Sequence, residues 1–432
     1  MEWFVKILTS IITLFVVAAV PNNIEMTIPI GVLALLYSML TIYQVRDNQN
    51  LLVLFSIIFY INLSVFVLGP LTRGLTFGAY QFDMWNSAYN TIGMKCILIS
   101  SVVFFVFFYN QNMKKRDFKK YTESIPLKDN NIISFICLIA VLLICTFSFN
   151  GSARNGEYVS NSNALYEYVI FIMALAWYYG GKSILMRFMW AFCAAYYLFI
   201  GLIAGDRSSA FMLMALIVLY KFKDLSIRKV LILCLAGIFA ANAIFLFREG
   251  SIFGGGDAVL YKQGLRTFFS DTAAQSYYSG LTIYYYFDRI INDTVSLFIN
   301  WVITIFSGSL FVDRTTVEFS KLAADYNFNG GGGLFQPTFY AFYGYLGVVL
   351  GSIIVAYLLK KVYYSWNNTF CMLLWFVIPA MSFRWYLYTP TTFFRACLFN
   401  FGILYLVAKV FDNMTKPSKH HVSKLVHRRN NS

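Results

Sequence analysis

Charged side chains are scarce in this chain, and their scarcity excludes a water-soluble fold. Asp, Glu, Lys and Arg make up 12% of the 432 residues, whereas 59% of the residues are hydrophobic. A soluble domain carries about twice that charged fraction, because its surface must be covered with polar groups. The composition therefore predicts an integral membrane protein.

Residues that bind metals or form disulfides are few and poorly placed for either role. The three histidines all lie in the C-terminal tail, and no Asp-x-Asp pair occurs in the predicted outer loops. The seven cysteines occur singly in apolar segments, without Cys-x-x-Cys spacing, at positions 96, 137, 145, 193, 234, 371 and 397. We therefore expect no disulfide framework, no bound metal and no cofactor.

Apolar segments of spanning length recur along the chain. A helix needs roughly 20 residues to cross a bilayer. The segments lack the alternation of a barrel strand, so we predict helices. The fold class is then an all-α polytopic integral membrane protein, with twelve clear segments at 3–20, 27–43, 51–69, 88–109, 132–149, 164–180, 187–204, 208–222, 229–247, 338–359, 369–387 and 392–409.

Residues 294–311 form a further apolar segment that disturbs this count. A single extra crossing there would move Lys360 and Lys361 to the outer side. Residues 268–287 can supply the second arm of a hairpin, which gives fourteen helices. Alternatively, both segments lie at the outer interface as amphipathic or re-entrant pieces, which gives twelve. Of these two arrangements we favour the hairpin.

Lysine and arginine in the loops set the predicted orientation. The connection from Asn110 to Asn131 carries six of them, and the tail that starts at Lys409 carries six more. Such loops remain in the cytoplasm, so both termini are predicted to be cytoplasmic. This distribution explains the net charge of +14 without a nucleic-acid partner. We predict one transmembrane domain at 1–410, larger periplasmic loops around 248–267 and 312–337, and a basic cytoplasmic tail at 411–432.

The basic residues on the predicted outer side are mostly arginine. Nine of these twelve cations are Arg, against six of twenty-two on the cytoplasmic side. The planar guanidinium grips phosphate or carboxylate with two hydrogen bonds, whereas lysine is a hydrated point charge. The outer side is thus suited to hold anions. The alternative is that each arginine pairs with a nearby acid or extends to lipid headgroups.

The turn at 204–209, Ala-Gly-Asp-Arg-Ser-Ser, is the strongest candidate site. It places Arg207 between two apolar segments with almost no loop, at or just below the outer interface. A charge there is costly unless something compensates it. Arg248 and Glu249 are a second pair of charged residues, at the outer end of the next predicted helix pair. The predicted catalytic residues are Arg207, Arg248, Glu249 and Asp206.

A second set of residues is predicted to bind the substrate. Tyrosines near residue 280 have flat faces that can pack on sugar rings, although an interfacial aromatic belt is the alternative. Further arginines of the outer side complete the set. The predicted substrate-binding residues are Arg266, Arg289, Arg314, Tyr277, Tyr278, Arg384 and Arg395.

Two groups of glycines have predicted structural roles. The run Gly330–Gly333 is not a nucleotide-binding loop, because no Lys-Ser/Thr pair follows it, and it instead allows mobility or close backbone approach. Gly344, Gly347 and Gly351 repeat at helical spacing. They predict a small helical face for tight packing.

Taken together, these features resemble the Wzy-type O-antigen and related repeat-unit polymerases. The resemblance rests on the Gly-Asp-Arg-Ser-Ser turn, the arginine-bearing second outer loop, and the glycine run before a Tyr-rich, Gly-spaced helix. It implies a multi-pass protein of the bacterial inner membrane that joins undecaprenyl-pyrophosphate-linked oligosaccharides at the periplasmic face. It also implies contact with membrane lipid, a chain-length-determining co-polymerase and a repeat-unit flippase as partners.

The expected chemistry is a metal-independent glycosyl transfer. An acceptor hydroxyl attacks the anomeric carbon, arginines stabilise the departing pyrophosphate, and a carboxylate accepts the proton, with Glu249 the first candidate and Asp206 the second. The alternative function is a flippase or transporter of the same lipid-linked units. A transporter places its cations at mid-membrane and shows repeat symmetry between its halves, and no internal repeat is evident here. A structural subunit would leave the excess of outer arginine unexplained.

Overall fold

The structure is a computed structural model of the chain, and the residues that it describes are helical apart from turns and short connections. The described ranges are 2–72, 87–109, 127–148, 164–203, 207–221, 226, 228–230, 232–233, 236–237, 268–290, 294–308, 310–311 and 332–415. Across these ranges there is no strand, and the only β-type pairing is an isolated bridge between Asp129 and Gly180. The predicted all-helical class is confirmed for this part of the chain.

Six of the described helices are long and apolar enough to cross a membrane. They cover Ile24–Val45, Gln49–Leu71, Tyr89–Phe108, Ile184–Gly201, Phe335–Tyr364 and Thr392–Thr415. Six shorter apolar helices accompany them, at Phe4–Ala19, Asn131–Phe147, Leu165–Tyr179, Ser208–Lys221, Thr294–Ser307 and Thr369–Ala380. The protein is therefore a helical protein with membrane-spanning character.

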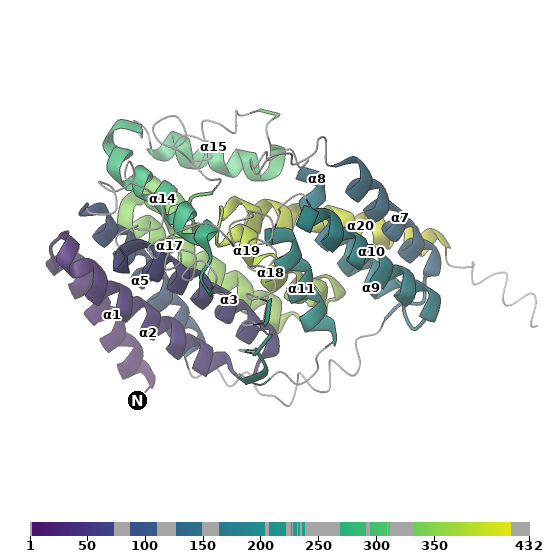
Figure 1. Ribbon diagram of the computed structural model, residues 1–432, viewed down its shortest axis with the longest axis horizontal. Coiled ribbons are helices and arrows are strands. Elements are labelled where there is room, and N and C mark those ends of the chain that lie inside the picture. Colours follow the sequence, from purple (N-terminus) through teal and green to yellow (C-terminus); the bar gives the residue numbers. More distant parts are fainter. Residues whose placement is uncertain are drawn as a thin grey trace, which may run out of the picture.

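Three groups of helices lie along the longest axis of the molecule (Figure 1). At one end α5 (Tyr89–Phe108) packs against α1 (Glu2–Ala19), α2 (Thr27–Val45) and α17 (Phe335–Tyr364), with α3 (Gln49–Phe66) beside α2. At the other end are α7 (Asn131–Phe147), α8 (Ala164–Glu167), α9 (Val169–Tyr179), α10 (Ile184–Ile203) and α20 (Phe401–Thr415). Between them lie α11 (Arg207–Lys221), α18 (Thr369–Ala380) and α19 (Ser382–Trp385).

Small polar residues join the helices of the first group. Ser38 on α2 contacts Ser101 on α5 at 2.9 Å, and Ser352 on α17 contacts Ser100 at 3.2 Å. Short side chains let helices approach closely, and their hydroxyl groups bond across the interface where apolar surroundings offer no other partner. These contacts fix α2, α5 and α17 in register.

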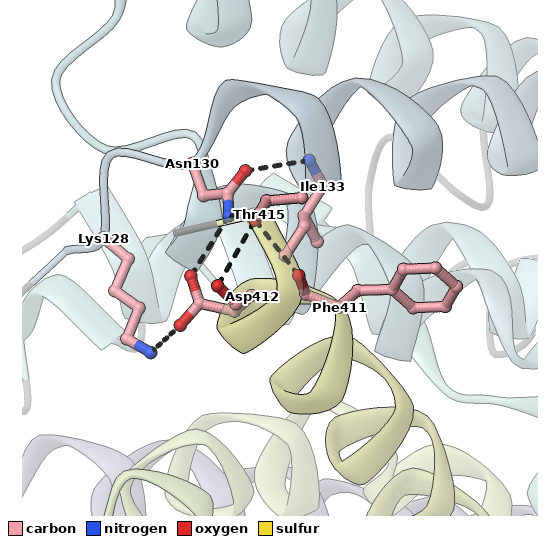
Figure 2. A network of polar contacts seen from close by, with 6 residues as sticks. All are labelled: Lys128, Asn130, Ile133, Phe411, Asp412 and Thr415. Carbon is pink, nitrogen blue, oxygen red and sulfur yellow. Dashed lines mark hydrogen bonds and ion pairs between the residues drawn. The ribbon is translucent and has the colours of Figure 1, made fainter. Parts of the chain in front are cut away.

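One face of the bundle carries lysine and acts as the anchor for several helix ends. Lys128 forms an ion pair with Asp412 of α20, and Asn130 donates to the same carboxylate at 3.1 Å (Figure 2). The Asn130 side chain also caps the start of α7 by accepting from the Ile133 amide. We call this end of the bundle, which contains Lys128, Asn130 and Asp412, the basic face. Within the described residues, the end of the predicted 110–131 connection thus meets the end of α20.

Lys95, which falls within the segment predicted at 88–109, has a structural role. It is buried on α5 and donates to the carbonyl oxygens of Val17 and Val20 and to Oδ1 of Asn22. The carbonyl groups at a helix C-terminus lack intrahelical partners and attract cations. Lys95 therefore ties the end of α1 to α5.

Helix α17 folds back on itself, which differs from the single span predicted at 338–359. Tyr343 and Gly344 have non-helical backbone angles, and Gly344 has a φ of 58°. Before this reversal, residues 335–342 lie against the later part of the helix, where Phe339 covers Gly347 and Gly351. A methyl group at either glycine would collide with Phe339. The predicted close packing is therefore seen at Gly347 and Gly351, against the folded-back residues 335–342, whereas Gly344 lies in the reversal itself and packs against none of the described residues.

The helix α14 (Asp271–Ile290) packs against α3, α5 and α17, and α15 (Thr294–Ser307) packs against α17. Tyr277 of α14 donates to the backbone oxygen of Asn90, at the start of α5. Trp301 of α15 packs against Phe339 and Phe342, and Figure 1 shows α15 crossing the top of the bundle. These contacts tie both helices to the bundle, and the choice between the hairpin and the interfacial arrangement remains a prediction. The total of twelve to fourteen crossings and the side of each terminus remain predictions.

Candidate functional site

Three helical segments, two of them from the central group and one from the end group that contains α9, surround the candidate site. The α8–α9 segment, α11 and the α18–α19 segment pack against one another. Near the basic face their contact consists of stacked rings: Trp177 lies 5.4 Å from Tyr220, and Tyr220 lies 4.8 Å from Phe376. We call these three residues the aromatic floor. Because the Asn130 amide donates to the backbone oxygen of Tyr179, two residues after Trp177, the aromatic floor lies on the side of the basic face.

Arg384 and Glu167 form an ion pair on the other side of the aromatic floor. Arg384 lies on α19 and its Nη2 is 3.3 Å from Oε1 of Glu167, the last residue of α8. The ring of Tyr388 lies 4.9 Å from the guanidinium carbon. Exposure is 11% for the Arg384 side chain and 31% for Glu167, so the pair is partly accessible. We call Glu167, Arg384 and Tyr388 the Arg384 cluster.

The Arg384 cluster lies about halfway through the bundle. The α18–α19 segment runs beside α3, because Asn50 bonds the backbone oxygen of Trp375 at 2.6 Å and Tyr386 bonds Asn62 at 3.0 Å. Arg384 is therefore almost level with Asn62, near the middle of the helix that covers Gln49–Leu71. An ionisable residue at such depth is costly and marks a functional site more often than a purely structural one.

A break between α18 and α19 places Arg384 at this depth. Pro379 lies in the last turn of α18, which ends at Ala380, and a short helix follows at Ser382–Trp385. After a turn, the chain returns as a π-helix, η6 (Thr392–Asn400). The predicted spans at 369–387 and 392–409 are therefore less regular than expected. Irregular backbone at membrane depth is tolerated where it is buried in protein or lines a cavity.

The start of α11 lies close to the Arg384 cluster. Phe211 of α11 stacks on Phe383 with ring centroids 4.9 Å apart, and Phe383 is the residue before Arg384. Arg207 begins α11 one turn before Phe211, and the next two residues, Ser208 and Ser209, are buried. The structure describes only the backbone of Arg207. The predicted Gly-Asp-Arg-Ser-Ser turn thus ends within one helical turn of the stacked rings beside Arg384.

The folded-back part of α17 meets the same region from the side of α3. The amides of Gly333 and Leu334 donate to the backbone oxygens of Tyr388 and Leu387, at 2.9 and 3.2 Å. Gln336, the second residue of the helix, donates to the Tyr386 hydroxyl at 2.8 Å. The chain before α17 therefore reaches the depth of the Arg384 cluster. The close approach predicted for the glycine run is seen at its end, where Gly332 lies against Tyr388 and Ser276.

A buried chain of polar groups holds this arrangement together. The Tyr386 hydroxyl lies between the side chains of Gln336 and Asn62, and all three residues are at most 2% exposed. Hydrogen bonds between helices replace the water that the interior lacks. They couple α3, the folded-back part of α17 and the turn after α19. This coupling positions Tyr388 and, through it, the guanidinium of Arg384.

Arg395, another predicted binding residue, occupies a different place. It lies on η6, and its guanidinium approaches Gly308 just after the end of α15. A cation is favourable at a helix C-terminus. No ion pair of Arg395 with a carboxylate occurs within the described ranges. Its position beside α15 indicates that Arg395 anchors this surface helix. A second contact joins the two elements: Trp301 of α15 donates to the hydroxyl of Thr391, the residue before η6, at 2.8 Å.

The predicted sugar-binding tyrosines are packed inside the protein. Tyr277 and Tyr278 are 1% and 3% exposed, and the Tyr277 ring lies over Gly93 of α5. In this structure they join α14 to the bundle, so their rings are not available on the surface. The aromatic belt that we weighed as the alternative does not describe them either, since both are buried.

The remaining predicted residues cannot be placed at the site. Arg289 lies on α14, where only its backbone is described. The others lie outside the described residues: Asp206, Arg248, Glu249, Arg266 and Arg314.

Sequence reasoning missed Glu167. It falls inside the predicted span at 164–180, where a lone carboxylate was treated as part of an apolar segment. The available signal was the free-energy cost of a carboxylate within an apolar segment, because such an acid requires a partner. Arg384, more than 200 residues later, supplies that partner.

The chain has no match among protein-family models, curated proteins or solved structures.

Proposed function

We propose that this protein is a glycosyltransferase of the bacterial inner membrane that polymerises oligosaccharide repeat units carried on undecaprenyl pyrophosphate. The observation that supports the proposal most is the Arg384 cluster: a guanidinium and a carboxylate at mid-depth, with the aromatic floor between them and the basic face. With the basic face on the cytoplasmic side, as the positive-inside prediction has it, a site on the other side of the aromatic floor suits an enzyme that works at the periplasmic face. The Wzy-type resemblance supplies the substrate class.

The reaction needs a group that binds the departing pyrophosphate. An acceptor hydroxyl attacks the anomeric carbon of the growing chain, the new glycosidic C–O bond forms, and the bond from that carbon to the pyrophosphate oxygen breaks. Negative charge then collects on undecaprenyl pyrophosphate. Arg384 is suited to stabilise it, because guanidinium binds phosphate in a bidentate manner and a partly dehydrated site strengthens that interaction. Arg207, at the start of α11, is the second candidate.

The proton of the acceptor hydroxyl needs a carboxylate. Among the described residues Glu167 is the acid closest to the arginine, and 31% of its side chain is exposed. When pyrophosphate takes its place on Arg384, the Glu167 carboxylate becomes available as a base. Glu249 and Asp206 remain further candidates. No metal ion is required in this scheme, because the guanidinium groups neutralise the leaving group.

A second candidate function has one specific observation in its favour. Transporters bind their substrates near the bilayer midplane, where helices are interrupted. The break between α18 and α19 and the folded-back start of α17 meet at such a depth. A flippase for the same lipid-linked units would use these elements, but the aromatic floor would then have to open during transport.

A deletion strain separates the two functions. Loss of a polymerase should leave surface glycans that contain a single repeat unit, because units still reach the outer side. Loss of a flippase should remove the repeat units from the surface altogether. We expect single units, with long chains restored by the wild-type gene and not by Arg384→Ala at equal membrane abundance. Unchanged long chains in the deletion strain would exclude both functions.

A further inference from the structure

An open groove lies between α1, α5 and α17, beside the last turn of α5. It has a volume of about 430 Å³. Its walls come from three helices that are far apart in the sequence. They comprise Lys6, Ile7, Ser10, Ile11, Val106, Phe107 and Lys360.

Contacts elsewhere in the bundle show which end of the helices this is. Lys95, near the start of α5, bonds the carbonyl groups at the end of α1, so the start of α1 lies beside the end of α5. Ser352 of α17 contacts Ser100 of α5, and Lys360 and Phe107 follow these two serines by eight and seven residues. The groove therefore lies where the connection after α5 begins, on the side that the lysine distribution predicts to be cytoplasmic.

Two lysines line the groove, one from α1 and one from α17, and its described lining contains no acid. Lys6 and Lys360 are both partly buried, whereas the neighbouring Lys361 is exposed and does not line the groove. Glu2 lies one turn before Lys6 and is described by its backbone only. Even with one carboxylate there, the groove keeps an excess of positive charge, which an anion would complement.

The other side chains of the groove are mostly apolar. Ile7 and Ile11 lie one turn apart on α1 and are 51% and 56% exposed, and Val106 and Phe107 form the α5 wall. The Ser10 hydroxyl donates to the backbone of its own helix. The polarity of the groove thus changes from cationic at the helix ends to hydrocarbon one turn deeper, which is the order found in a lipid with an anionic head.

We infer that this groove binds an anionic phospholipid of the cytoplasmic leaflet. Its phosphate lies between Lys6 and Lys360, and one acyl chain lies along Ile7 and Ile11. Basic pockets between helices on the cytoplasmic side attract anionic head groups, and each basic residue adds to that attraction. A zwitterionic lipid brings a cation of its own, which the two lysines repel. The inference is independent of the proposed function, because no residue of the Arg384 cluster takes part.

The bound lipid joins two helices that the groove separates. Lys95 holds the end of α1 against α5. The groove lies at the other end of α1, between that helix and α17. A phosphate that contacts both lysines bridges this space, so we expect an anionic lipid to raise the thermal midpoint of the protein in detergent.

The test measures binding of phosphatidylglycerol to the purified full-length protein in detergent by native mass spectrometry. We expect Lys6→Gln and Lys360→Gln each to weaken binding about fivefold, because each removes one cation beside the phosphate. Lys361→Gln is the matched control, since it removes the same charge one residue away and outside the groove, and it should bind like the wild type. Phosphatidylethanolamine should bind all four proteins weakly and equally.

A second variant separates loss of charge from loss of folding. Lys360→Arg keeps the cation, so it should bind phosphatidylglycerol as the wild type does and gain as much in thermal midpoint when the lipid is added. Lys360→Gln should gain less.

Three results would overturn the proposal. Equal losses in Lys360→Gln and Lys361→Gln would show a general attraction to a basic surface. Wild-type binding in both groove variants would show that the lipid lies elsewhere. Displacement of the lipid by inorganic phosphate would assign the two lysines to a free anion, because a lipid held along the apolar wall resists a competitor that lacks a tail.

Discussion

Two ion pairs in different regions of the molecule show how differently the same chemistry can be used. At the basic face, the Asp412 side chain is 3% exposed and its carboxylate accepts from both Lys128 and Asn130 (Figure 2). In the Arg384 cluster, Glu167 meets Arg384 through one oxygen at 3.3 Å and stays 31% exposed. The first pair belongs to a closed network that fastens helix ends. The second joins α8 to α19 and is partly exposed.

Lys95, inside the bundle, is a second cation with a structural role. Its ammonium group has three acceptors at the end of α1, which matches the three donors of lysine. A cation with all its donors used holds the fold and has nothing left for a ligand. Arg384 instead pairs with a carboxylate that is 31% exposed, so this ion pair is reached more easily by solvent than the ammonium of Lys95.

The largest effect on polymer synthesis is expected from removing the guanidinium of Arg384. Arg384→Ala should lower the rate of polymer synthesis about a hundredfold, because charge-assisted hydrogen bonds of about 1.5 to 3 kcal/mol act in the transition state. Arg384→Lys keeps the charge and loses the fork, so we expect an intermediate rate. Synthesis is measured in purified membranes at equal protein abundance. A wild-type rate for the Arg384→Lys variant would show that only the charge matters.

Removing Lys95, whose donors all have acceptors, should lower stability and leave synthesis per molecule unchanged. Lys95→Ala leaves buried acceptors without a donor, at a cost of roughly 2 to 3 kcal/mol in stability. We expect a lower thermal midpoint in detergent and reduced membrane abundance, with normal synthesis per molecule. Lys95→Arg should recover part of the stability. A Lys95→Ala protein of normal stability that cannot synthesise polymer would remove the distinction between the two cations.

The folded-back part of α17 allows a test of the region that supports the Arg384 cluster. Gly351→Ala places a methyl group against the Phe339 ring, and we expect a loss of about 1 to 3 kcal/mol in stability. Gly402→Ala is the matched control, since its methyl group would make only ordinary contact with Phe370. Phe339→Leu should relieve the strain of Gly351→Ala. Without such rescue, the close approach of the two parts of the helix would be wrong.

The smallest effect is expected at the basic face. Asp412→Asn removes the ion pair with Lys128, whose side chain is 36% exposed, while the amide can keep a hydrogen-bonded place in the network. Ion pairs with a solvated partner contribute about 1 kcal/mol or less. We expect a slight drop in thermal midpoint, smaller at high salt, and unchanged polymer synthesis. A large loss of synthesis would connect this face to the site.

Particular elements show where prediction from the sequence succeeded. The apolar segments gave the helical class, and the Lys-rich connections gave a common face for Lys128 and the end of α20. Arg384 was selected because arginine is concentrated outside the Lys-rich loops. Its carboxylate partner was missed, because Glu167 is distant in the chain and lies within an apolar segment.

Hydropathy also misread two predicted spans. The reversal at Tyr343 and Gly344 and the break after Ala380 involve residues as apolar as those of a straight helix. Composition alone cannot show whether such a stretch continues or turns, because both forms satisfy the requirement for burial.

The sequence by itself determined that the chain forms apolar helices and that lysine and arginine separate along it, since both follow from local composition. Only the tertiary structure decided which cation has a buried structural role and which pairs with a partly exposed carboxylate. Lys95 and Arg384 each lie in an apolar stretch, and what distinguishes them is the set of groups that other helices bring to them. A hydrogen-bond partner across the bundle is a property of packing, and local sequence carries no record of it.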